Sequence, residues 1–178
     1  MRAIRFLKGY GVETGSVIEL RIQDDFDGKA AGLSVAGRYD FKTRSAYLAP
    51  FSDLKERGTP FDLPVNDILY QSIATHEIAH AIIAENFAIS SPSVKAREYL
   101  AYVTMFATMP VASRQQLFEK EPATAFGSET DINTFLYLFD PIRFGQRAYK
   151  HFSKLSDPSA FIRRILAGQA LAADDVIY

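Results

Sequence analysis

Two hydrophobic patterns divide the chain near residue 65. Before it, short apolar runs alternate in part with polar residues, as in Val17-Ile18-Glu19-Leu20-Arg21-Ile22, and end at turn-forming residues such as those of 24–28. Partial alternation between turn signals is typical of strands, and Lys42-Thr43 is placed to join two of them. The elements expected in this part are a helix at 3–9, a strand at 17–22, a hairpin of strands at 33–41 and 44–49, and a loop rich in proline and glycine at 50–64.

From residue 66 onward the apolar positions follow the helical repeat. Asn66 is suited to cap a helix that runs to about residue 88, and apolar side chains surround this helix nearly completely. A helix of that kind lies buried at the centre of a domain. The further helices expected run from Ser93 to before Pro110 and at 112–119, 130–139, 141–154 and 158–166.

These patterns predict one α+β domain over residues 1–178. Its β-rich part, residues 1–64, should form a small mixed sheet with a hairpin, and its mostly helical part, residues 65–178, should surround the central helix. A length of 178 residues supports one core but is short for two ordinary domains.

Composition narrows the classes of partner. A net charge of −1 and the lack of a lysine and arginine cluster argue against nucleic-acid binding. No apolar run is long enough to span a bilayer, and residues 1–10 lack the apolar core of a signal peptide. The absence of cysteine fits a cytoplasm and an oxidising compartment equally well, so the expectation is a soluble chain that is cytoplasmic as given, or secreted or periplasmic if a leader has been removed.

The string His76-Glu77-Ile78-Ala79-His80 carries the most chemical information. A random shuffle of this composition would produce His-Glu-x-x-His roughly 0.003 times per chain. Two histidines four residues apart lie on one face of a helix, so both can bind one metal ion, and the spacing suits zinc. Glu77 projects about 100° away, beside a water bound to the metal, where a general base belongs. The alternative is a pair of helix histidines satisfied by hydrogen bonds in the core.

A catalytic zinc also needs a third protein ligand. Ile83 and Asn86 stand where the metzincin arrangement requires glycine and histidine, and Glu85 faces another direction on the helix. Glu98 remains, on an apolar face of the next helix, and a short loop would bring it back toward the histidines. The alternative for Glu98 is a surface ion pair with Lys95.

His-Glu-x-x-His followed by a glutamate on the next helix resembles the gluzincins, the thermolysin-like zinc metallopeptidases. The resemblance implies a zincin-like fold in which His76, His80 and Glu98 bind one Zn²⁺ per chain and Glu77 activates the water. It also implies a substrate lying along an edge strand, for which 44–49 is the best candidate. Arg97 and the pair Ala101-Tyr102 depart from the pattern of thermolysin-like enzymes, which have Asn and Ser-Asp there.

The expected function is zinc-dependent hydrolysis of peptide bonds, with a peptide or protein as substrate. His151, the third histidine, is a candidate donor to the oxyanion. Tyr102 and the aromatic run 135–139 are expected in the core, and Asp174-Asp175 in solvent. Two alternatives stay open, a non-catalytic zincin-like binding domain and an amide hydrolase acting on a non-protein or peptidoglycan substrate. The sequence gives no indication of oligomeric state.

Overall fold

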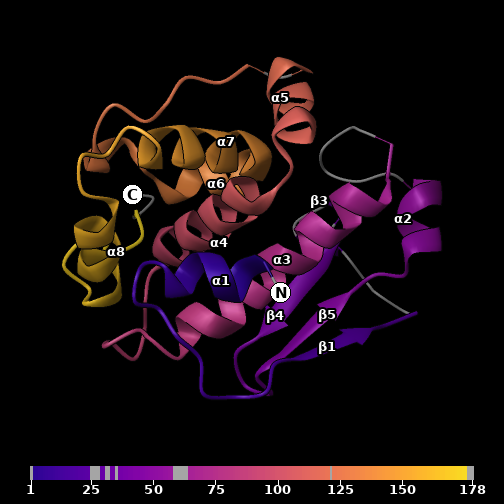
Figure 1. Cartoon of the computed structure of the whole chain (residues 1–178), viewed down its shortest axis with the longest axis horizontal. Coiled ribbons are helices and arrows are strands. Elements are labelled where there is room, and N and C mark those ends of the chain that lie inside the picture. Colours follow the sequence, from indigo (N-terminus) through magenta and orange to yellow (C-terminus); the bar gives the residue numbers. More distant parts are fainter. Residues whose placement is uncertain are drawn as a thin grey trace.

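The helices and strands of the chain surround one long helix, α3 (Figure 1). A computed structural model describes residues 2–24, 29–30, 33–34, 36–57, 64–120 and 122–175. In chain order the elements are α1 (Arg2–Lys8), β1 (Glu19–Ile22), β2 (Lys29–Ala30), β3 (Leu33–Ser34), β4 (Gly37–Asp40), β5 (Ser45–Leu48), α2 (Phe51–Arg57), α3 (Asp67–Ala84), α4 (Val94–Thr108), α5 (Val111–Lys120), the 3-10 helix η1 (Glu129–Asp131), α6 (Thr134–Phe139), α7 (Pro141–Phe152) and α8 (Pro158–Leu166).

The α+β class is confirmed, with a small three-stranded sheet and a mostly helical remainder. The sheet has the order β1-β5-β4, in which β5 runs parallel to β1 and antiparallel to β4. A separate antiparallel pair joins β2 and β3. The sheet lies against one side of α3, and α4, α6 and α7 gather beyond it (Figure 1).

The prediction that 44–49 forms an edge strand is wrong, because β5 is the middle strand of the sheet. Ser45, Ala46 and Leu48 are buried, and these small or apolar side chains suit a central strand. Its second partner, β1, comes from before the hairpin and pairs in parallel, which hydrophobic patterning alone does not reveal. Among the described strands, β4 forms the edge that packs on α3.

The turn of the hairpin forms where it was predicted, although it contains neither glycine nor asparagine. Asp40 accepts hydrogen bonds from the backbone nitrogens of Lys42 at 2.8 Å and Thr43 at 3.2 Å. Arg44 adopts the left-handed conformation, with φ of 55°, and its guanidinium forms an ion pair with Glu85 at the end of α3. A tertiary contact therefore supports a conformation that glycine would usually supply.

The predicted loop at 50–64 contains a helix instead, α2. Its Leu54 is fully buried and donates its backbone N–H to the carbonyl of Pro50. Proline fits the start of a helix, because the first residues there need no N–H partner. The rest of that segment, 58–63, lies outside the described residues.

The two central helices begin where the sequence places them. Asn66 and Ser93 cap α3 and α4 by accepting hydrogen bonds from Leu69 and Ala96. Helix α3 ends at Ala84, four residues early, because the side chain of Asn86 folds back onto the carbonyl of Ile82. No helix of the described residues is long and apolar enough to cross a membrane.

One prediction about the C-terminal part is wrong. The run 135–139 is not uniformly buried, since Leu138 is 52% and Phe139 82% exposed on the short helix α6. Its five hydrophobic residues cover about 1.4 helical turns, and only one side of α6 faces α4 and α7.

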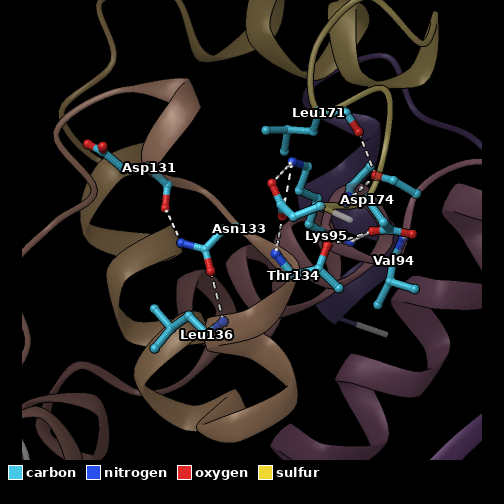
Figure 2. Close-up of polar contacts among 11 residues, drawn as sticks. Val94, Lys95, Asp131, Asn133, Thr134, Leu136, Leu171 and Asp174 are labelled. Carbon is cyan, nitrogen blue, oxygen red and sulfur yellow. Dashed lines mark hydrogen bonds and ion pairs between the residues drawn. The ribbon is translucent and has the colours of Figure 1, made fainter. Parts of the chain in front are cut away.

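Asp174 is exposed, as expected, and Asp175 is half-buried, but both also tie the last described residues to two helix starts (Figure 2). Asp174 accepts from the backbone nitrogens of Val94 and Lys95 at 2.9 and 3.2 Å and from the hydroxyl of Thr134 at 2.7 Å. Asp175 accepts from the backbone nitrogen of Thr134 at 2.6 Å. Carboxylates are stabilised at helix N-termini by the free N–H groups there, and these two hold α4 and α6 together.

Candidate metal centre

Three candidate ligand side chains converge between α3 and α4. Nε2 of His76 lies 3.1 Å from Nε2 of His80. Oε2 of Glu98 lies 3.4 Å from Nε2 of His76, and Oε1 of Glu98 lies 3.5 Å from Nε2 of His80. Ligands about 2.0–2.1 Å from a tetrahedral zinc lie roughly 3.3–3.4 Å apart. The spacing of the three side chains therefore fits one zinc ion, and they form a group able to hold a metal within the described residues.

Helix geometry and aromatic packing position these ligands. The four-residue spacing stacks the two imidazoles on one face of α3, with ring centroids 4.7 Å apart. The ring of Tyr102 packs edge-on against His76 at 4.4 Å, and that of Phe41 lies 6.4 Å from His80. Because Glu98 meets both histidines and Tyr102, one turn later, meets the earlier one, α4 runs antiparallel to α3, as predicted.

Tyr102 in turn is held by a close approach of α7. A Cβ placed on Gly145 would lie 2.4 Å from Cδ1 of the Tyr102 ring. Only a residue without a side chain lets the two helices come this close. Tyr102 is 7% exposed, which confirms its expected place in the core.

The other ring nitrogens of the two histidines have no protein partner. Nδ1 of His76 and Nδ1 of His80 are buried, and neither forms a hydrogen bond within the described part of the chain. Zinc-binding histidines commonly donate this N–H to a carboxylate or carbonyl, which orients the ring and strengthens binding. In this site the rings are oriented by Tyr102 and Phe41, through packing.

Glu77 lies beside the ligands in an enclosed position. Glu77 is 6% exposed, and burial raises the pKa of its carboxyl to about 7. A Cβ on Gly37 of β4 would lie 2.8 Å from Oε1 of Glu77, so the edge strand touches this carboxylate. A carboxyl that titrates near neutral pH can both accept and return a proton.

Glu98 responds to the same enclosure in the opposite way. Burial alone would raise its pKa, but the facing imidazoles of His80 and His76 outweigh burial and hold the pKa well below its ordinary value. Glu98 is therefore ionised, as a zinc ligand must be. It does not pair with Lys95, whose ammonium contacts Asp175 at 3.1 Å.

Sequence reasoning missed Tyr137 of α6. Burial, followed by the negative charge of Glu98 and a hydrogen bond to it, raises the pKa of the Tyr137 hydroxyl. This phenol is therefore a neutral donor beside the ligands. The position of Tyr137 within an aromatic run gave no sign of this role. The contact between Gly37 and Glu77 was also missed, although a glycine inside a predicted strand often marks a close approach of the backbone.

The structure does not bring His151 to this group. Its Nδ1 lies 2.7 Å from the hydroxyl of Tyr99, and its ring packs against Phe161. Burial lowers the pKa of His151, and the negative charges of Glu129 and Asp131 oppose this effect without cancelling it. Helix α7 directs this side chain toward α8, so the role of His151 as a donor to the oxyanion stays a prediction that this arrangement does not support.

Comparison with known proteins gives a family without an assigned activity. No curated protein and no solved structure matches the chain. The family described as "Family of unknown function (DUF6639)" matches residues 1–175 of the 178. The chain therefore belongs to the DUF6639 family.

Proposed function

We propose that the protein is a zinc-dependent hydrolase that cleaves peptide bonds, of the gluzincin type. The observation that supports this most is the convergence of His76, His80 and Glu98 at zinc-ligand distances, with Glu77 beside them. A bound zinc ion would polarise the scissile carbonyl and lower the pKa of a water molecule.

Glu77 is the general base in this proposal. Its carboxylate takes a proton from the attacking water and returns it to the leaving amine. Its pKa of about 7 matches both transfers near neutral pH, because an effective acid–base group titrates near the pH at which it works.

Tyr137 replaces His151 as the donor to the oxyanion. Its hydroxyl stays protonated because burial and Glu98 raise its pKa. Its single O–H, which donates to Glu98 in this structure, would turn from that carboxylate to the developing negative charge. Strand β4 is the edge along which a substrate would lie, since it is the outer strand next to Glu77 among the described strands.

Two alternatives make different use of the same site. A non-catalytic zincin-like binding domain needs the three ligands but no base. The burial of the Glu77 carboxylate would then destabilise the fold without serving a function. An amide hydrolase acting on a non-protein or peptidoglycan substrate would use every residue named above. The first alternative predicts that the protein binds zinc but hydrolyses nothing. The second predicts that it hydrolyses a non-protein or peptidoglycan amide but leaves proteins and ordinary peptides uncleaved.

Elemental analysis combined with a peptide-library digest tests the proposal. The wild-type chain should carry about one zinc and cleave peptides, whereas Glu77→Gln should retain the metal and lose cleavage by roughly 100-fold or more. Glu119→Gln, an exposed glutamate of α5, is the matched control and should behave as wild type. Cleavage that survives Glu77→Gln would contradict the role of the base, and loss of metal would make Glu77 a ligand.

A further inference from the structure

An arginine lies near the candidate metal centre. Arg97 immediately precedes the ligand Glu98 on α4, and its guanidinium carbon lies 4.6 Å above the ring of Phe41. That ring lies 6.4 Å from the ring of His80. The two distances together place the guanidinium within about 11 Å of the His80 ring, and Phe41 forms the wall between them.

The terminal nitrogens of Arg97 are available to a ligand. Its Nε donates to the carbonyl of Ser93 at 3.4 Å, a bond within its own helix. No carboxylate of the described residues forms an ion pair with it, whereas Arg44 and Arg164 pair with Glu85 and Glu129. The residue is partly buried, so its charge is less well hydrated than that of an exposed arginine.

The contact with Phe41 restrains this charge. A guanidinium held over an aromatic ring loses part of its freedom, which lowers the entropy that a further hydrogen-bonded partner would cost. The charge of Arg97 favours a lower pKa of Tyr137, although burial and Glu98 raise that pKa more strongly. Arg97 and the candidate metal ligand Glu98 therefore both act electrostatically on Tyr137.

We propose that Arg97 binds a carboxylate of the substrate, and that the protein cleaves peptides carrying a carboxylate within one or two residues of the scissile bond. A guanidinium binds a carboxylate with two parallel hydrogen bonds, which selects for that group over an amide. Successive Cα atoms are about 3.8 Å apart, so two residues cover roughly 7.6 Å, and a hydrogen bond of about 2.9 Å from the guanidinium extends this to roughly 10.5 Å, near the limit of about 11 Å. The proposal depends on the hydrolase function above, and it names the class of substrate.

The carboxylate has two possible sources, the C-terminus of the peptide or an acidic side chain. Three acetylated tripeptides separate the two sources. The first contains glutamine and ends in a free carboxylate, the second is the same peptide with an amidated C-terminus, and the third is amidated and has glutamate in place of the glutamine. Each is titrated by calorimetry into the zinc-loaded Glu77→Gln chain, which should not hydrolyse the peptides. Zinc content is measured on the same sample.

The expected result is that one carboxylate peptide binds about 10- to 100-fold more tightly than the neutral amide, as a hydrogen-bonded charge pair would give. Adding Arg97→Gln should reduce that preference to less than about twofold, while Arg97→Lys should retain part of it. Arg163→Gln, an exposed arginine of α8, is the control and should leave the preference intact.

The outcomes also separate this proposal from the one on which it depends. A zinc-loaded chain that binds acid and amide equally, or binds neither, overturns the role of Arg97 while the metal centre stands. A preference that survives Arg97→Gln assigns the carboxylate to another group and overturns it too. A chain that takes up no zinc contradicts the hydrolase function itself.

Discussion

Replacing Gly37 by alanine tests how closely β4 approaches Glu77, the proposed catalytic base. The added Cβ would lie 2.8 Å from Cγ and Oε1 of Glu77 and 2.9 Å from Cδ2 of Leu48. Ordinary contacts between carbon atoms are about 3.5–4.0 Å, so the strand or the carboxylate must move by roughly 0.7–1.2 Å. Glu77 is 6% and Leu48 1% exposed, which leaves neither side chain room to move into solvent.

The effect should appear in stability and in catalysis but not in metal content. Overpacking of this kind costs about 1–3 kcal/mol, which lowers the Tm of a chain of this size by roughly 2–12 °C. A displacement of about 1 Å at Glu77 should reduce hydrolysis roughly 100-fold. Zinc content should stay near one per chain, because the contacts of this Cβ do not include a ligand.

Thermal unfolding followed by circular dichroism, with Gly15→Ala as the matched control, gives the comparison. A Cβ on Gly15 meets nothing within 4 Å, and its φ is not positive. Gly15→Ala should therefore leave Tm unchanged or raise stability by up to about 1 kcal/mol. If Gly37→Ala unfolds at the same temperature as Gly15→Ala, the close contact between β4 and Glu77 is refuted.

Three further changes probe other parts of the account. Glu98→Ala should weaken zinc binding by roughly 100-fold or more, measured by competition with a chelator, since even a residue that only supports a ligand is worth 10–100-fold; unchanged affinity would remove Glu98 from the ligands. Gly145→Ala should lower Tm and zinc affinity together, because its Cβ would push the Tyr102 ring that packs on a ligand; a wild-type Tm would show that the helices can separate. Burial raises the pKa of Asp175, but the N–H of Thr134 and other donors outweigh it and hold the pKa below its ordinary value. A carboxyl of that kind stabilises the fold above its unfolded pKa and loses this contribution as the pH falls through its folded pKa, so Asp175→Asn should lower stability at pH 7 and flatten the loss below about pH 5 in pH-dependent unfolding; identical curves would remove the contact from the account.

Local signals predicted the central helices well because their causes lie within a few residues. Asn66 and Ser93 cap helices through their own side chains, and the histidines of α3 share a face by helical periodicity. The third candidate ligand, Glu98, could be named because an acidic residue on an apolar face needs a partner.

Features set by distant parts of the chain were not predictable in the same way. The middle position of β5 depends on β1, and the tie formed by Asp174 depends on helix starts some 40 and 80 residues away. Tyr137 reaches Glu98 because of how α6 packs on α4. Periodicity reports which face of an element is buried, but not which element covers it.

Diffraction from crystals of the zinc-loaded chain, measured on both sides of the zinc absorption edge, tests the metal centre most directly. We predict one anomalous peak about 2.0–2.2 Å from Nε2 of His76, Nε2 of His80 and an oxygen of Glu98. A map without that peak, or a peak at a different set of side chains while these three keep their positions, would contradict it.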